Sequence, residues 1–213
     1  MDIRFVPDPE LTTELRRQLV TLWTEVTNAG GAVGFVAPVT EEQVRPTADA
    51  AFAGIDDGHD RLLVGYEGMR PVAFLIFASN RFALKAHWCT LKRVMVHPGR
   101  QRSGYGEAIM REAERLGRQA GWDALHVTLR GGLGLERFYQ RCGYREVGRL
   151  PGALRLAPGD DRDEVLMWLP LRAPQVAAQE VAAQEVALQG GSPEVAAQGG
   201  SPVAARSGHR TSP

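Results

Sequence analysis

Cysteine is nearly absent from this chain. Only Cys89 and Cys142 occur among 213 residues, without a Cys-x-x-Cys pair or the Cys/His spacing of zinc ligands. This scarcity argues against a disulfide framework and against a structural zinc site, so no metal is expected. We expect both thiols to be reduced and buried, and Cys142 to be a packed side chain rather than a nucleophile.

An excess of charge of either sign is also missing. Lys and Arg together number 25, and so do Asp and Glu. A chain with this balance has no overall field that would attract a polyanion, so we predict no nucleic-acid partner.

Long apolar runs are lacking as well. The opening residues, MDIRFVPDPELTTEL, carry acids early and contain no long apolar stretch. We therefore expect neither a secretory signal nor a membrane span, no membrane partner, and a cytoplasmic location.

The last part of the sequence has no aromatic residue, and its composition changes sharply after Leu171. Residues 173–213 repeat short units such as VAAQE and GGSP. Such a segment buries too little apolar surface to offset the entropy cost of ordering it. We predict one domain over residues 1–172 and a low-complexity, disordered tail over residues 173–213.

The remaining sequence has the hydrophobic pattern of an α+β domain. Apolar residues at helical spacing predict a helix over about residues 9–28, which Gly30-Gly31 would end. A second helix is expected from Thr40 toward Gly54, interrupted at Pro46. Further helices are predicted over residues 105–120 and 133–141, and strands over residues 3–6, 61–66, 71–79, 87–96, 123–129, 144–150 and 165–171. This order fits a central mixed sheet, mostly antiparallel, with flanking helices.

The most informative stretch leads from a predicted strand directly into a long helix. It includes the run Gln101-Arg102-Ser103-Gly104-Tyr105-Gly106. A helix N-terminus presents unpaired N–H groups and partial positive charge, so it can bind a pyrophosphate. Gly104 and Gly106 would let the backbone approach the phosphates, and Arg100 and Arg102 would add charge-assisted contacts. The competing interpretation is an ordinary turn with solvated arginines.

Three neighbouring features favour the phosphate-binding interpretation. An apolar strand ending in Pro98 precedes the loop, an amphipathic helix follows it, and Phe138-Tyr139-x-x-x-Gly143-Tyr144 follows one strand later. Together these motifs resemble the GNAT superfamily of acyl-CoA N-acyltransferases, whose loop reads Arg/Gln-x-x-Gly-x-Gly/Ala. The resemblance covers roughly residues 1–171.

The resemblance implies a GNAT-like fold, acetyl-CoA as acyl donor, and direct attack of an amine on the thioester. It also implies that the sheet splays near the end of the strand over residues 87–96, where the pantetheine would lie. Backbone N–H groups there would stabilise the thioester oxygen. The residues implied in acetyl-CoA binding are Val94, Met95, Val96, Arg100, Gln101, Arg102, Ser103, Gly104, Tyr105 and Gly106.

More narrowly, the loop over residues 30–35, the Met95-containing strand and residues 148–152 resemble the tabtoxin resistance protein group. In that group the first loop helps to build the acceptor pocket. Thr90 and Thr128 stand where that group has a glutamate and an aspartate, so tabtoxin is not the expected acceptor. The expected pocket residues are Gly30, Gly31, Phe35, Thr90, Thr128, Arg130 and Glu136, with a helix stop as the alternative role of the two glycines.

Tyr139 occupies the position of the tyrosine that often protonates the departing thiolate in this superfamily. The alternative role for Tyr139 is a core aromatic. His126 shares a strand face with Thr128, and His87 opens the strand that leads to the loop, so either could be the general base. A lone histidine is more often a packed or surface residue, and His97 is expected to shape the turn with Pro98.

The predicted function is therefore N-acetyl transfer from acetyl-CoA to a small-molecule amine, such as an antibiotic, a toxin or an amino-acid-like metabolite. One alternative is acetylation of a protein or peptide amine. Another is a non-catalytic acyl-CoA sensor or interaction protein that uses the repetitive tail as a binding arm. A homodimer is compatible with each of these functions.

Overall fold

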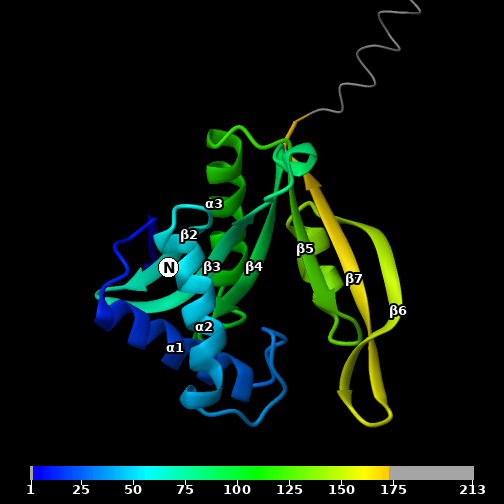
Figure 1. The fold of residues 1–213 in the computed structure, drawn as a ribbon, viewed down its shortest axis with the longest axis horizontal. Helices are drawn as coiled ribbons and strands as arrows, with labels where there is room; N and C mark the ends of the chain where they lie inside the picture. Colours follow the sequence, from blue (N-terminus) through cyan, green and yellow to red (C-terminus); the bar gives the residue numbers. More distant parts are fainter. Residues whose placement is uncertain (1, 173–213) are drawn as a thin grey trace, which may run out of the picture. The chain divides into compact units, whose positions relative to one another are not determined.

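The computed structural model describes residues 2–172, and the predicted tail over residues 173–213 lies outside the described residues. Within residues 2–172, four α-helices flank a seven-stranded mixed sheet of order β1-β2-β3-β4-β5-β7-β6 (Figure 1). This arrangement confirms the α+β fold class. The elements are β1 (Arg4–Pro7), α1 (Thr13–Asn28), α2 (Glu41–Asp56), β2 (Arg61–Glu67), β3 (Arg70–Ser79), β4 (Trp88–Val96), α3 (Tyr105–Gln119), β5 (Ala124–Arg130), α4 (Leu135–Arg141), β6 (Arg145–Ala157) and β7 (Asp160–Pro170), with short 3₁₀ turns at Ala83–Lys85 and Pro98–Arg100.

Threonine side chains define where α1 and α2 begin. Thr12 accepts a hydrogen bond from the backbone N–H of Leu15, and Thr40 forms a reciprocal capping box with Gln43. The predicted interruption of the second helix is wrong, because α2 runs unbroken through Pro46. Pro46 is exposed, so the carbonyl group that loses its helical partner there can bond to water instead.

The core lies on both faces of the sheet. Side chains of β3 alternate between the two faces, with Leu75 and Phe77 on one side and Phe74 and Ile76 on the other. The first pair packs in the cluster that includes α3, and the second packs in the cluster with α1 and α2. The sheet is thus covered by different helices on its two faces.

β4 and β5 are parallel neighbours, and they stay paired only briefly. Their pairing covers three residues and ends where Thr90 lies opposite His126. A bulge at Arg93, whose φ is +55°, then bends β4 while it follows β3. The two strands therefore diverge toward the end of β4 (Figure 1), and the predicted splay near residues 94–96 is confirmed.

The last two strands are longer than the sequence predicted. β6 and β7 form an antiparallel hairpin that continues past the end of β5, which pairs with β7 only as far as Glu164. Most residues of β6 are exposed, so the continuous apolar pattern that marks a buried strand is missing there. The prediction over residues 144–150 therefore found only the first half of β6.

Candidate active site

The loop between β4 and α3 leaves the start of α3 without a side-chain cap. Gly104 is the N-cap residue, with φ of +86° and no side chain, and Arg102 also has a positive φ, of +61°. The side-chain caps of α1 and α2 accept hydrogen bonds from N–H groups of the first turn, whereas no side chain in the described part of the chain caps the first N–H groups of α3. These donors, with the helix dipole, fit an anionic group such as a pyrophosphate.

Glu67, at the end of β2, binds the loop between β4 and α3 through its carboxylate. Its carboxylate accepts hydrogen bonds from Arg100 Nε, at 2.7 Å and 2.8 Å, and from the Tyr105 hydroxyl. The Tyr105 hydrogen bond, followed by the Arg100 hydrogen bond, lowers the pKa of Glu67. Arg100 thus has its Nε committed to a carboxylate, whereas Arg102 is exposed and forms no ion pair within residues 2–172.

The rest of the predicted loop is arranged by local contacts. Gln101 Nε2 donates to the carbonyl of Val96 at 3.2 Å, and Ser103 Oγ donates to the carbonyl of Arg100. His97 Nδ1 accepts from the N–H of Gly99 at 3.1 Å, as expected for a residue that shapes the turn.

Gly106 has a packing reason that the sequence did not reveal. A Cβ atom at this position would lie 3.2 Å from the ring of Phe138 on α4. Gly106 therefore lets the start of α3 lie close against α4, whereas Gly104 meets the backbone requirement of the turn.

Tyr139 is buried between α4 and the sheet. Its ring packs edge-on against Phe138, at 5.0 Å between centroids, and against Tyr144, at 5.5 Å. Burial raises the pKa of Tyr139, so its phenol stays protonated at neutral pH. The side chain is thus both a core aromatic and a group able to donate a proton.

Tyr144 carries a buried hydroxyl group with no hydrogen-bond partner among residues 2–172. Burial raises its pKa well above the usual value, so it also stays neutral. Its ring lies beside Tyr139 and gives the site a second tyrosine in the same apolar setting.

His126 lies on the sheet face opposite α3, between two tryptophans. Its ring is 5.7 Å from the ring of Trp88 on β4 and 6.3 Å from that of Trp168 on β7. Thr90 Oγ1 lies 3.5 Å from His126 Nδ1. Burial lowers the pKa of His126, and Lys85 lowers it further, although Glu164 acts in the opposite direction. The imidazole is therefore neutral at pH 7 and able to accept a proton.

The other predicted polar residues lie in different settings. His87 is exposed in the segment before β4 and does not join the ring cluster around His126. Thr128 is exposed on β5, two residues after His126 and hence on the same strand face. Glu136 on α4 lies 3.8 Å from Arg149 of β6.

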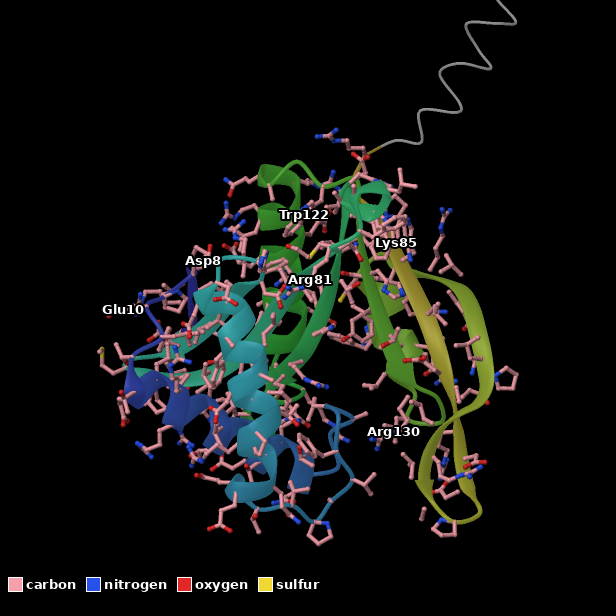
Figure 2. All side chains as sticks on the ribbon, viewed as in Figure 1. Asp8, Glu10, Arg81, Lys85, Trp122 and Arg130 are labelled. Atoms are coloured by element: carbon pink, nitrogen blue, oxygen red, sulfur yellow. The ribbon has the colours of Figure 1, made fainter. Side chains whose placement is uncertain are left out.

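Two arginines hold the loop between α1 and α2. Arg130, at the end of β5, donates from Nη2 to the carbonyl of Phe35 at 2.9 Å (Figure 2). Arg93, at the bulge of β4, donates from Nη1 to the carbonyl of Val33 at 3.2 Å. The structure thus brings Phe35 and Arg130 together, and their role in an acceptor pocket stays a prediction.

Gly30 and Gly31 end α1 by their backbone geometry. The N–H of Gly31 donates to the carbonyl of Val26 at 2.9 Å, and Gly30 has φ of +91°. A Cβ atom on Gly31 would lie 2.7 Å from the same carbonyl oxygen. The helix-stop role is therefore present, and the acceptor role of these glycines stays a prediction.

Both cysteines are free thiols, but only Cys89 is buried as expected, whereas Cys142 is half-buried. Burial raises the pKa of Cys89 to about 12 and also raises that of Cys142, so neither is an activated nucleophile. No group of three metal-ligating side chains is found within residues 2–172. In the same part of the chain no helix is long and apolar enough to cross a membrane.

Sequence reasoning missed several residues of this site. Trp88 and Trp168 surround His126, and only the strand alternation that places Trp88 with Thr90 could have indicated one of them. Arg93 and Glu67 had no sequence signal, because a bulge and a contact between distant strands place them.

Comparison with known proteins gives consistent results. The family model described as "Acetyltransferase (GNAT) family" matches residues 18–144. The fold is similar to that of an N-acetyltransferase from Staphylococcus aureus Mu50, with a TM-score of 0.66, 12% identity, and coverage of 81% of this chain and 100% of that one. It is also similar to the ribosomal-protein-S18-alanine N-acetyltransferase from Escherichia coli, with a TM-score of 0.60, 17% identity, and coverage of 80% and 96%. The yncA protein from Salmonella typhimurium, solved with its cofactor acetyl-CoA, has a TM-score of 0.65, 14% identity, and coverage of 82% and 96%.

Proposed function

Because the chain belongs to the acetyltransferase (GNAT) family, we propose that it transfers an acetyl group from acetyl-CoA to the amine of a small molecule. The observation that supports this best is the divergence of β4 from β5 beside the uncapped start of α3. Anion-binding donors and a separated strand pair suit a ligand that joins a pyrophosphate to a long, thin arm.

The residues at this place fit acetyl-CoA, which supplies an activated acyl group on a thioester. The first N–H groups of α3 and the exposed Arg102 would bind the pyrophosphate. Beyond Thr90, β4 has no strand partner on the β5 side within residues 2–172, so backbone groups of residues 94–96 that point there can pair with the pantetheine amides. The same backbone would donate to the thioester oxygen.

Two side chains have the protonation states that acyl transfer to an amine needs. His126 is neutral and half-buried, so it can take the proton of the acceptor's ammonium group, directly or through water, which leaves the neutral amine free to attack the thioester. Tyr139 is protonated and lies on the α3 side of the sheet, so it can donate a proton to the departing thiolate. A thiol has a pKa of about 8.5, so the gain from Tyr139 should be moderate.

The acceptor would reach the site from the sheet face that carries His126, Thr90 and Thr128. A small-molecule acceptor is our proposal, and the likeness to the tabtoxin resistance group stays a prediction. The second candidate is acetylation of a protein amine, since the similar Escherichia coli protein is named a ribosomal-protein-S18-alanine N-acetyltransferase.

Acetyl-CoA should be incubated with a panel of small amines and short peptides while released thiol is measured. Amine-dependent release with small molecules supports the proposal, whereas release with peptides alone favours the second candidate. Acetyl-CoA binding without any transfer would indicate a sensor.

The cofactor assignment is tested separately by calorimetry. Arg102→Gln should weaken acetyl-CoA binding about 3- to 10-fold through loss of one charge-assisted contact. Arg81→Gln, in the exposed segment before β4 and so at the opposite end of that strand from the loop, is the matched control and should bind normally. Equal affinity of both variants and the original chain would contradict the loop assignment.

A further inference from the structure

Four arginines within residues 2–172 are partly buried, and two of them lack a carboxylate partner. Arg16 is paired with Asp56 at 2.7 Å and Arg61 with Asp8 at 2.6 Å. Arg93 and Arg130 are also half-buried, but they form no ion pair within 4.0 Å in the described part of the chain. The two uncompensated cations are the two that border the proposed acceptor face.

The guanidinium groups of Arg93 and Arg130 converge on one short segment of the loop after α1. They donate to the carbonyls of Val33 and Phe35, two residues apart. Two residues of extended chain span at most about 7 Å, so the charged groups are held near each other. Arg93 comes from the β4 bulge and Arg130 from the end of β5, so they meet where the two strands have separated.

The surroundings of Arg93 fix its position. Its guanidinium carbon lies 4.8 Å from the ring centre of Trp23, whose Nε1 donates to the same Val33 carbonyl at 2.9 Å. A Cβ atom on Gly34 would lie 2.3 Å from Arg93 Nη1, so the loop is shaped to admit this group. Burial lowers the pKa of Arg93, which reflects the cost of holding its charge there.

The two loop carbonyls use only a small part of the hydrogen-bonding capacity of Arg93 and Arg130. A guanidinium has five N–H donors and a full charge, and Arg93 and Arg130 each give one nitrogen to a loop carbonyl. A partly desolvated cation is costly unless an anion compensates it. Glu164 is the register partner of Arg130 on β7, yet it does not come within ion-pair distance.

We propose that Arg93 and Arg130 bind a carboxylate of the acceptor, so that the acceptor class is amines that also carry a carboxylate, such as amino acids. This inference rests on the proposed acetyl transfer. Arg130, Thr128 and His126 share one face of β5 at two-residue spacing, so the anion and the proton acceptor lie along the same strand. A carboxylate held by the arginines would then direct the amine end of the molecule toward His126 and the strand separation.

The test uses matched pairs of acceptors with the full chain and acetyl-CoA. Each of a set of amino acids is compared with its own α-amide, which keeps the amine and removes the charge of the carboxylate. Arg130→Gln retains a donor for the Phe35 carbonyl but removes the cation, and Arg130→Lys keeps the cation. Arg93→Gln is the second variant, and Arg81→Gln, at an exposed residue before β4, is the control for a general loss of positive charge.

We expect the original chain to prefer the acids over the amides, and Arg130→Gln to raise KM for the acids about 10- to 100-fold more than it changes KM for the amides. Arg130→Lys should recover part of the preference, a rescue that a purely structural role would not produce in the ratio of acid to amide. Acetyl-CoA affinity should be unchanged in Arg130→Gln; a loss there would mean that the bound anion is a phosphate of acetyl-CoA.

Other outcomes separate this inference from the proposed function. The inference would be overturned if amides or amines without a carboxylate were acetylated as fast as the acids. It would also be overturned if the preference for acids survived in both Gln variants. Either result leaves the acetyltransferase proposal intact. Absence of thiol release with every amine tested would instead refute the proposed function. If Arg93→Gln does not fold, the Arg130 variants still decide the result.

Discussion

The two adjacent tyrosines of the site allow the catalytic role of Tyr139 to be tested against a matched control. Tyr139→Phe and Tyr144→Phe each remove one hydroxyl group from neighbouring rings, 5.5 Å apart, in the same apolar cluster. The ring packing is kept in both variants, so differences between them report on the hydroxyl groups. The two changes are expected to act on different quantities.

Tyr139→Phe should lower turnover, because its protonated phenol is proposed to supply a proton as the thiolate leaves. General acid catalysis of this kind contributes roughly 10² to 10⁴, and a thiolate is a good leaving group, so we expect a fall of about 10- to 1,000-fold. The affinity for acetyl-CoA should hardly change, since the contacts of the pyrophosphate loop are untouched.

Tyr144→Phe should instead raise stability and leave turnover unchanged. Its hydroxyl is buried without a partner within residues 2–172, and an unsatisfied buried polar group costs about 1 to 3 kcal/mol. For a domain of this size, 1 kcal/mol corresponds to about 2 to 4 °C in melting temperature. We therefore expect an increase of several degrees by calorimetry.

Single-turnover and steady-state assays with one confirmed acceptor, together with melting curves, measure both effects. Unchanged turnover in Tyr139→Phe would refute the proton-donor role and leave this side chain a core aromatic. Loss of turnover in Tyr144→Phe, with Tyr139→Phe active, would show that Tyr144 is the proton donor instead of Tyr139.

Four further predictions follow from contacts and pKa shifts. Because burial lowers the pKa of His126, protonation favours the unfolded chain. The stability that the neutral ring contributes is complete above the unfolded pKa of about 6.5 and declines as pH falls. Plots of melting temperature against pH from 5 to 8 should therefore differ in slope between the original chain and His126→Gln, and parallel plots would contradict this. Gly34→Ala should lower the melting temperature by about 2 to 8 °C, because φ of +103° costs an alanine about 1 to 2 kcal/mol. The new Cβ should also displace Arg93. An unchanged melting temperature would mean that the loop adapts freely. With the pKa of Cys89 near 12, alkylation at pH 8 followed by mass spectrometry should modify Cys142 first and Cys89 only after unfolding, and early labelling of Cys89 would show that the core opens. A chain ending at Arg172 should keep its melting temperature and turnover, and a marked loss of either would show that the tail docks on the domain.

The hydrophobic pattern was sufficient for most elements of the fold. Helical spacing of apolar residues predicted α1 and α3 to within a few residues at each end, because one face of each helix packs on the sheet. The rule that proline interrupts a helix failed at Pro46, where solvent exposure allows α2 to continue, and the hydrophobic pattern failed in β6, which is too exposed to show an apolar stripe.

What the sequence determined by itself is local: the strand, turn and helix around Gly104, the capped starts of α1 and α2, and the motif that leads to the family. These features depend on residues close together in the chain, whose backbone preferences and caps act over one or two turns. Tertiary structure decided which distant side chains meet. His126 and the two rings around it come from three strands. The uncompensated charges of Arg93 and Arg130 come together only because β4 and β5 separate near the bulge at Arg93 and both side chains reach the loop after α1. Burial and charge compensation are properties of that arrangement, so no spacing in the sequence could have indicated them.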